Sequence, residues 1–367
     1  MPPYPPPRNQ IASGSTGSSG SSFTRTHARS TSDAPAMPLE LFYQVFENLS
    51  PSSLSSVART SSAFNGVTER MLYRRLELNS SAQAIQCFQT LVKKPSSWTS
   101  VQECVIMISD AKNNAAQFQP ILASALRLLT RLTSLHLAVE GPFVTVLDGC
   151  NFPSLKTFSS IVDLCPWAPM ANFLYRHPSI THFCIGGEVP GQHFALPPGT
   201  LPNLQTFMGS RRLVSTFVPN RPVSRATLAW HSPNLETEVN SVIPSLSMSS
   251  VPLTTFSCAT PGWSSTLVRS IAAYLPELKS IRLLNVSVDY HNEAELYSTL
   301  ADVLSSFTDL SKLEIPCSRQ IQSILTLEEE AGRAKTWHAL APRLAQIVFP
   351  SGHLWENISG RWTRVAQ

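Results

Sequence analysis

The chain has 367 residues, more than one compact core usually contains, and this length favours a small module followed by a larger domain or an elongated array of repeats. Hydrophobic residues make up 43% of the chain and charged residues 14%, so most of it can bury apolar surface, although 29 prolines interrupt long regular elements. The net charge of +4 is spread without a basic cluster, which argues against nucleic acid or an acidic membrane as a partner.

The seven cysteines are scattered, odd in number and nowhere spaced as CxxC, so we interpret them as reduced, mostly buried thiols. The N-terminus lacks the continuous apolar stretch of a secretory signal, and no later run of about 18 apolar residues is long enough to span a bilayer. We therefore expect a soluble intracellular protein of the cytoplasm, the nucleus or both.

Residues 1–36 are rich in Pro, Ser, Gly and Thr and contain almost no large apolar side chains. Such a segment buries too little apolar surface to offset the entropy lost on ordering. The composition predicts a disordered tail.

Residues 37–78 contain three short helical patterns. Apolar residues recur at helical spacing behind Pro38, which suits a first helical turn, and Ser50 can cap a second helix. Three helices of this size bury too little to be stable alone. Their exposed apolar face therefore needs a neighbouring domain, a partner, or both.

Residues 79–367 repeat one unit, in which an amphipathic helix and a turn lead into a short segment of the form LxxLxxΦxΦ, where Φ is apolar. Alternating apolar positions in that segment are typical of a strand with one buried face. The segments are VQECVIMI from Val101, LTSLHL from Leu132, FPSLKTF from Phe152, PSITHFCI from Pro178, LPNLQTF from Leu201, ATLAW from Ala226, PLTTF from Pro252, LPELKSIRL from Leu275, LSKLEI from Leu310 and LAQIVFP from Leu344.

Helical patterns lie between several of these segments, around Phe88, Leu122, Ile271 and Leu300. The spacing overlaps that of leucine-rich repeats but is less regular, and the regular Asn of such repeats is missing, with Asn285 one place off the expected position. We predict an α/β fold in which an irregular leucine-rich-repeat solenoid has one strand and one helix per repeat. A doubly wound α/β sheet is the alternative.

The segment from Met37 resembles the F-box family, which opens with Leu-Pro or Met-Pro and a Glu-Leu pair. The matching residues are Met37, Pro38, Glu40, Leu41, Val45, Phe46, Leu49, Leu54, Val57, Arg59 and Phe64, followed by LYRRLEL. The whole chain resembles the F-box proteins with irregular repeats that are expanded in mushroom-forming fungi. The C-terminal LAQIVFPSGHLWENISGRW is similar to the closing segment of those proteins.

The resemblance implies that the apolar face of the first two helices binds a Skp-type adaptor protein, and through it a cullin scaffold. The expected contact residues are Met37, Pro38, Leu39, Leu41, Val45, Phe46, Leu49, Leu54 and Val57. An aliphatic strip of this kind suits the groove of a partner protein. In the alternative interpretation, the strip packs only on the first repeat and caps the open end of the solenoid.

No catalytic, cofactor-binding or metal-binding residue is predicted. His177, His182 and Cys184 do not have the spacing of a closed zinc site, and we expect core or loop roles for them. The run Glu328, Glu329 and Glu330 is interpreted as a solvated helix face. Most of the tryptophans are expected to pack in the core.

These features together predict a non-enzymatic adaptor of an SCF (Skp, cullin, F-box) ubiquitin ligase. Its repeats would bind an unknown protein substrate, and the bound machinery would supply the catalysis. The alternative is a cullin-independent scaffold or interaction protein built on the same two parts. A repeat fold indicates a capacity to bind and does not identify the target.

Overall fold

The computed structural model describes residues 39–93, 98–109, 115–139, 143–161, 167–187, 195–230, 232, 234–287, 293–318 and 324–365. The predicted tail at 1–36 lies outside the described residues, as do Met37 and Pro38. The described part begins with a three-helix unit, which consists of α1 (Leu39–Phe46), α2 (Pro51–Ala58) and α3 (Ser62–Leu72). Three short helices were predicted in this region.

Serine caps fix the start of two of these helices. The Ser50 hydroxyl accepts a hydrogen bond from the Ser53 backbone N–H at 3.2 Å, directly before Pro51 in the first turn of α2. The Ser61 hydroxyl accepts from the Phe64 N–H at 3.1 Å in the same way. These caps satisfy backbone donors that a helix start otherwise leaves unpaired.

Thirteen strands within the described residues form a single sheet whose strand order follows the chain order. Neighbouring strands are parallel from β1 to β11, and the last two pairings are antiparallel. The strands are β1 (Arg75–Leu78), β2 (Glu103–Ile108), β3 (Ser134–Val139), β4 (Thr157–Ile161), β5 (His182–Gly186), β6 (Thr206–Ser210), β7 (Arg225–Ala229), β8 (Thr255–Thr260), β9 (Ser280–Asn285), β10 (Lys312–Glu314), β11 (Gln346–Val348), β12 (Leu354–Ile358) and β13 (Arg361–Val365).

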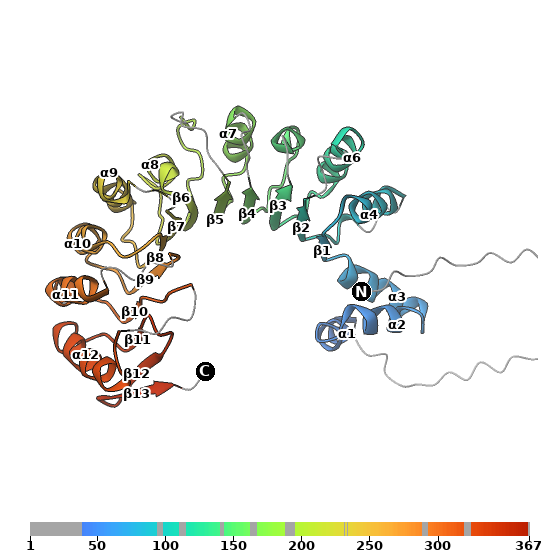
Figure 1. Cartoon of the computed structure of the whole chain (residues 1–367). Coiled ribbons are helices and arrows are strands. Elements are labelled where there is room, and N and C mark those ends of the chain that lie inside the picture. The colour runs from blue at the N-terminus through green and yellow to red at the C-terminus, as the bar shows by residue number, and fades with distance from the viewer. Residues whose placement is uncertain are drawn as a thin grey trace, which may run out of the picture.

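Helices and short 3₁₀ turns connect most of the parallel strands and lie on the outer side of a curved array, while the strands line its inner side (Figure 1). They are α4 (Ser81–Lys93), α6 (Ala115–Leu128), η2 (Phe143–Leu147), α7 (Trp167–Arg176), η3 (Arg211–Leu213), α8 (Val214–Phe217), α9 (Leu235–Ser247), α10 (Ser265–Tyr274), α11 (Glu293–Val303), η4 (Leu304–Ser306) and α12 (Leu327–Leu340). The array curves because a helix is about 10 Å wide and strands are about 4.8 Å apart.

The repeat solenoid is therefore confirmed, and the doubly wound alternative is wrong. A doubly wound sheet needs crossovers and helices on both faces, whereas here each strand lies beside its predecessor and the helices cover one face (Figure 1). Each of the ten predicted strand segments overlaps a strand of the sheet. The final segment RLEL of the predicted F-box is also a strand, β1, and its Leu76 and Leu78 belong to the solenoid core.

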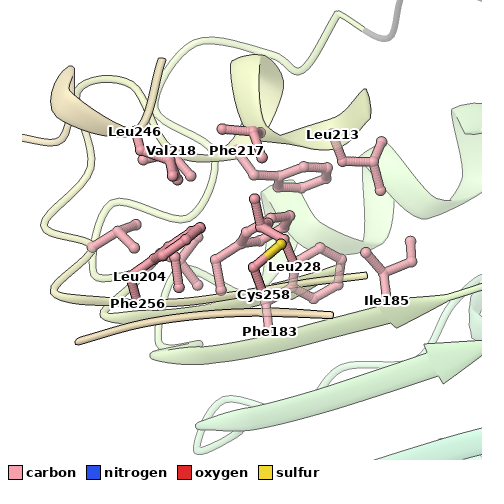
Figure 2. Close-up of a cluster of buried hydrophobic side chains, with 14 of the residues drawn as sticks. Phe183, Ile185, Leu204, Leu213, Phe217, Val218, Leu228, Leu246, Phe256 and Cys258 are labelled. Atoms are coloured by element: carbon pink, nitrogen blue, oxygen red, sulfur yellow. The ribbon is translucent and has the colours of Figure 1, made fainter. Parts of the chain in front are cut away.

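The solenoid core lies between the sheet and the helices. Strand residues alternate between buried and partly exposed along almost every strand, so one face of the sheet packs under the helices. Figure 2 shows one section, where Phe183 and Phe256 from the sheet lie below Phe217 of α8. The rings of Phe183 and Phe217 are 4.9 Å apart between centroids.

Hydroxyl side chains form the hydrogen bonds between neighbouring repeats that a regularly placed Asn forms in more regular leucine-rich repeats. Residues just before several strands donate from their hydroxyl to a backbone carbonyl of the preceding repeat, as Thr133 does to Gln102 at 3.0 Å and Thr254 to Ser224 at 3.1 Å. Thr181, Ser224 and Ser311 make the same bond. Asn285 is fully buried and accepts from the N–H groups of Gly262 and Ser287, so this single Asn also links two repeats.

The C-terminal hairpin of β12 and β13 closes the solenoid. Its two-residue turn, Ser359 and Gly360, has positive φ at both positions, as type I′ hairpins require. Trp355 of β12 and Trp362 of β13 are buried, as are Trp230, Trp263 and Trp337 elsewhere, which confirms the expected core role of these five tryptophans.

The interpretation of the acidic run as a solvated face is wrong for Glu330, which is fully buried on α12. Its carboxylate accepts hydrogen bonds from Ser351 at 2.6 Å and from Trp355 Nε1 at 2.9 Å, and lies 3.1 Å from His353 Nδ1. A buried carboxylate is tolerated because these donors replace its water shell. Glu328 and Glu329 are exposed, and Glu329 forms a capping box with Thr326.

Candidate partner-binding surfaces

The three-helix unit has a small apolar core of its own. Phe46, Leu54 and Val67 are its buried apolar side chains among the described residues, and half-buried neighbours such as Phe42 and Phe64 pack around them. The ring centroids of Phe42 and Phe64 are 4.9 Å apart. This cluster is separate from the solenoid core. A unit with so few buried side chains gains little stability from its own packing.

The outer face of α1 exposes two aliphatic side chains. Leu41 is 43% exposed and Val45 is 57% exposed, and they stand one helical turn apart on the same face. They are apolar side chains in contact with water next to a small core. Such a pair is typical of a surface that a partner covers.

The other predicted contact residues have different surroundings. Phe46 and Leu54 are buried within the small core, whereas Leu49 and Val57 are half-buried against it. Leu39 is the first residue of α1. The structure therefore brings the predicted residues of α1 and α2 into one unit, with Leu41 and Val45 as its most exposed members. Whether each of them touches an adaptor remains a prediction.

Polar groups join the three-helix unit to the first repeat. Arg74 lies 3.4 Å from the Glu47 carboxylate and donates to the side-chain oxygen of Gln102 at 3.1 Å. A polar hollow of about 790 Å³, lined by residues that include Tyr43, Arg70 and Arg131, lies at this junction. Because Leu41 and Val45 face water rather than the first repeat, the structure does not support the alternative in which they serve only to cap the solenoid.

The inner face of the sheet is a second candidate surface. We use this name for the strand side chains that alternate with the buried ones. Charged residues gather at its two ends, where Arg75 contacts Glu77 at 2.7 Å near the start and Lys312 contacts Glu314 at 2.9 Å near the end. Between them, from β3 to β8, its residues are mostly small: Ser134, His136, Ala138, Thr157, Ser159, Ile161, His182, Cys184, Gly186, Thr206, Met208, Ser210, Arg225, Thr227, Ala229, Thr255, Ser257 and Ala259.

The inner face is hollowed over β5 to β9. This hollow has a volume of about 880 Å³, and its floor includes Ser210, Ala229 and Ala259, which are register partners on three neighbouring strands. Met208 and Leu284 also line it. Small floor residues leave the backbone of the sheet accessible to a side chain from outside, so the hollow can accept a bulky apolar group.

A network behind the hollow fixes the turn after β6. Arg211 pairs with the Glu238 carboxylate of α9, which also accepts from Trp230 Nε1 at 2.9 Å and from the Ser232 hydroxyl at 3.3 Å. Burial alone would raise the pKa of Glu238, but the hydrogen bonds from Arg211 and Trp230 outweigh it and lower that pKa. Glu238 is therefore a structural anion that holds Arg211 in place.

His177 has different surroundings from His182 and Cys184, for all of which core or loop roles were expected. His177 is buried between aromatic rings, where its Nε2 accepts from the Phe152 N–H at 2.9 Å and its Nδ1 donates to the Phe173 carbonyl at 2.7 Å. His182 and Cys184 instead lie on the inner face of β5. His177 therefore has the core role that was expected.

The described cysteines are free thiols, and burial raises the pKa of Cys104 and of Cys258 to about 12, so neither is a nucleophile near neutral pH. Cys165 lies outside the described residues. Within the described parts of the chain, no group of three or more metal-ligating side chains comes together. None of the described helices is long and apolar enough to cross a membrane.

Two features of the structure were not predicted from the sequence. The hollow was not predicted, although its signal is present in the small residues that occupy alternate positions of the segments around Ser210, Ala229 and Ala259. The burial of Glu330 left no local signal, because its donors come from residues more than twenty positions later. Residues brought together by the closing hairpin have no pattern that a short window can detect.

Comparison with known families agrees with the sequence resemblance. Residues 34–79 match the family described as F-box-like, a family of typically non-catalytic adaptors. The match contains the three-helix unit and the strand β1. A search of curated proteins finds no match to the chain.

Proposed function

We propose that the protein is a substrate-recruiting adaptor of an SCF ubiquitin ligase. The observation that carries the proposal is the exposed pair Leu41 and Val45 on a three-helix unit that matches the F-box-like family and has its own small core. An F-box-like domain implies binding to a Skp-type adaptor. Covering this pair removes apolar surface from water, which favours the complex.

Within this proposal, Leu41 and Val45 form the direct contact, together with Met37, Pro38 and Leu39 at the start of the unit. Leu49 and Val57 extend the contact, while Phe46 and Leu54 hold α1 and α2 at the angle that presents it. A contact of this kind depends on a few well-buried apolar anchors more than on its total area.

The adaptor works by proximity. A Skp-type protein on the three-helix unit links it to a cullin scaffold, and the solenoid holds a protein substrate, which raises the effective concentration of a substrate lysine near the charged conjugating enzyme. The hydrogen bond from Arg74 to Gln102 joins the three-helix unit, which would bind the adaptor, to the solenoid, which would hold the substrate. The proposal needs no catalytic residue in this chain, and it implies an intracellular location, as for the fungal proteins that the sequence resembles.

The direct test is co-purification of the full chain with a Skp-type adaptor. We expect the wild type to bind stoichiometrically and Leu41→Asp or Val45→Asp to lose binding, because burying an unpaired carboxylate costs on the order of several kcal/mol. Val92→Asp is the matched control, because Val92 is 52% exposed on α4 of the solenoid. It should bind as the wild type does.

Two results would contradict parts of the proposal. If the folded wild type does not bind any Skp-type adaptor, or if Val92→Asp loses binding as completely as Val45→Asp, the adaptor-binding role of α1 is wrong. If the adaptor binds but no cullin joins the complex, the cullin-independent scaffold is the better description.

A further inference from the structure

The inner face has an uneven distribution of charge. At its first end Arg75 is paired with Glu77 and lies 3.7 Å from Glu103, so opposite charges offset each other. From β3 to β8, none of the inner-face side chains in the described strands is a carboxylate. Arg225 of β7 is exposed there, and it has no ion pair with any described residue.

The far side of the hollow adds further positive charge. Arg282, which lines the hollow, lies 3.5 Å from Glu314, and the same carboxylate is 2.9 Å from Lys312. One carboxylate between two cations leaves a net positive charge. Arg211, also in the lining, is already paired with Glu238. The hollow is thus flanked by Arg225 on one side and, on the other, by a positively charged cluster that contains Arg282 and Lys312.

The spacing of these groups suits an extended peptide. Ala229 at the floor is four residues beyond Arg225 on the same strand, which corresponds to about 13 Å. An extended chain covers that distance in about four residues. Arg282 lies two strands away from β7, at about 10 Å by the usual strand spacing. A peptide with a carboxylate and a bulky side chain about four residues apart can therefore place the carboxylate at Arg225 and the bulky side chain over Ala229.

We propose that the hollow over β5 to β9 binds an acidic peptide segment of the recruited protein. One large apolar side chain enters over Ala229 and Ala259, and carboxylates pair with Arg225 and with the Arg282 and Lys312 cluster. The charge of the flanks selects against basic segments, and the small floor residues select for a bulky anchor. This inference rests on the proposed function, in which the solenoid holds the substrate.

Selection from a random peptide library displayed on phage tests this inference on the full chain. We expect the enriched peptides to be acidic and to contain a large aliphatic or aromatic residue. Binding of one enriched synthetic peptide should weaken about tenfold or more in Ala229→Trp, which fills the hollow, and in Arg225→Glu, which reverses the charge beside it. Both residues are exposed, so neither change disturbs the core.

Matched controls separate this effect from general damage. Ala138→Trp places the same side chain in the same row of the inner face on β3, outside the hollow, and Arg364→Glu reverses an exposed arginine on β13. Both should bind the peptide as the wild type does. Thermal unfolding of each variant checks its fold, and if Ala229→Trp does not fold, Arg225→Glu carries the test alone.

The inference is overturned if no peptide is enriched, if the enriched peptides are neutral or basic, or if binding is equal in Arg225→Glu and in Arg364→Glu. Co-purification of a Skp-type adaptor with the same preparations distinguishes the two proposals. Loss of peptide selectivity with the adaptor still bound overturns only this inference, whereas absence of adaptor binding overturns the proposed function.

Discussion

The three-helix unit and the solenoid bury apolar side chains on very different scales. In the described part of the unit, Phe46, Leu54 and Val67 form a core that stays separate from the rest, while one cluster in the solenoid runs from Leu76 to Trp362. Each solenoid repeat covers its neighbour, so the core grows with every repeat added. The three-helix unit lies at one end of the array (Figure 1), and the apolar pair Leu41 and Val45 on its α1 is exposed.

The difference indicates that a partner contributes most to the stability of the three-helix unit. A region with a large continuous core is stable alone and can present a fixed binding face, whereas a region with a small core gains a substantial part of its stability from the protein that covers it. Substitutions that weaken one region and leave the other intact test this difference.

The largest effect is expected in the solenoid. Phe256→Ala removes a fully buried ring from the section of the core shown in Figure 2, and it should lower the free energy of unfolding by about 3–5 kcal/mol. Thr255→Ala, on the inner face of the same strand, should change it by less than about 0.5 kcal/mol. Chemical denaturation measures both. Equal effects of the two changes would mean that the core does not lie where we describe it.

A smaller and more local effect is expected in the three-helix unit. Leu54→Ala should destabilise the unit by about 2–3 kcal/mol, the lower end for a buried leucine, while the solenoid transition stays unchanged because the two cores are separate. Hydrogen exchange resolved along the chain measures this, with Leu41→Ala as the exposed control. Faster exchange in the solenoid after Leu54→Ala would show that the two regions unfold together.

The buried carboxylate of Glu330 links α12 to the closing hairpin. Ser351, His353 and Trp355 contact the two oxygens of the Glu330 carboxylate, and Glu330→Gln leaves only one oxygen that can accept hydrogen bonds. We therefore expect the free energy of unfolding to fall by about 2 kcal/mol. Hydrogen exchange of the backbone amides should increase most in β12 and β13. Glu328→Gln, in the exposed part of the same run, is the control and should have no effect beyond about 0.5 kcal/mol.

The smallest expected effect is a dependence of the solenoid's stability on pH. Burial lowers the pKa of His177 below its usual 6.5, so the unfolded chain takes up a proton at a higher pH than the folded chain. Below pH 6.5 the unfolded state binds more protons, and the stability of the solenoid falls as the pH decreases toward the folded-state pKa.

Denaturant midpoints of the wild type and of His177→Gln at about pH 7.5 and about pH 5.5 measure this contribution. The wild type should lose more stability between the two pH values than the variant does. A loss of the same size in both proteins would show that His177 does not titrate in this range.

The strands of the solenoid could be predicted because each repeat carries its own signal. Segments such as LTSLHL and LPELKSIRL place apolar residues at alternate positions after a turn. This local pattern predicts a strand with one buried face and needs no information from the rest of the chain. The helices α7 and α9 were not predicted, although Met170, Phe173 and Leu174 show the expected spacing in α7.

Features that depend on distant residues were not predictable in this way. The hydrogen bonds from the hydroxyls of Thr133 and Thr254 replace those of a regular Asn, and only the stacking of repeats reveals their role. The closing hairpin was not predicted, although the pair Ser359-Gly360 is a local turn signal. In the three-helix unit, helical spacing indicated which residues are apolar, but only the structure separates exposed Leu41 and Val45 from buried Phe46 and Leu54.

Hydrogen exchange of the full chain, measured with and without a Skp-type adaptor, shows whether a partner stabilises the three-helix unit. We predict that amides of α1 to α3 exchange much faster than those of the solenoid strands in the free chain. Adding the adaptor should slow exchange in α1 to α3 and leave exchange in the solenoid strands unchanged. If the three helices are already as protected as the solenoid when free, and the adaptor changes nothing, the proposal that a partner completes this unit is wrong.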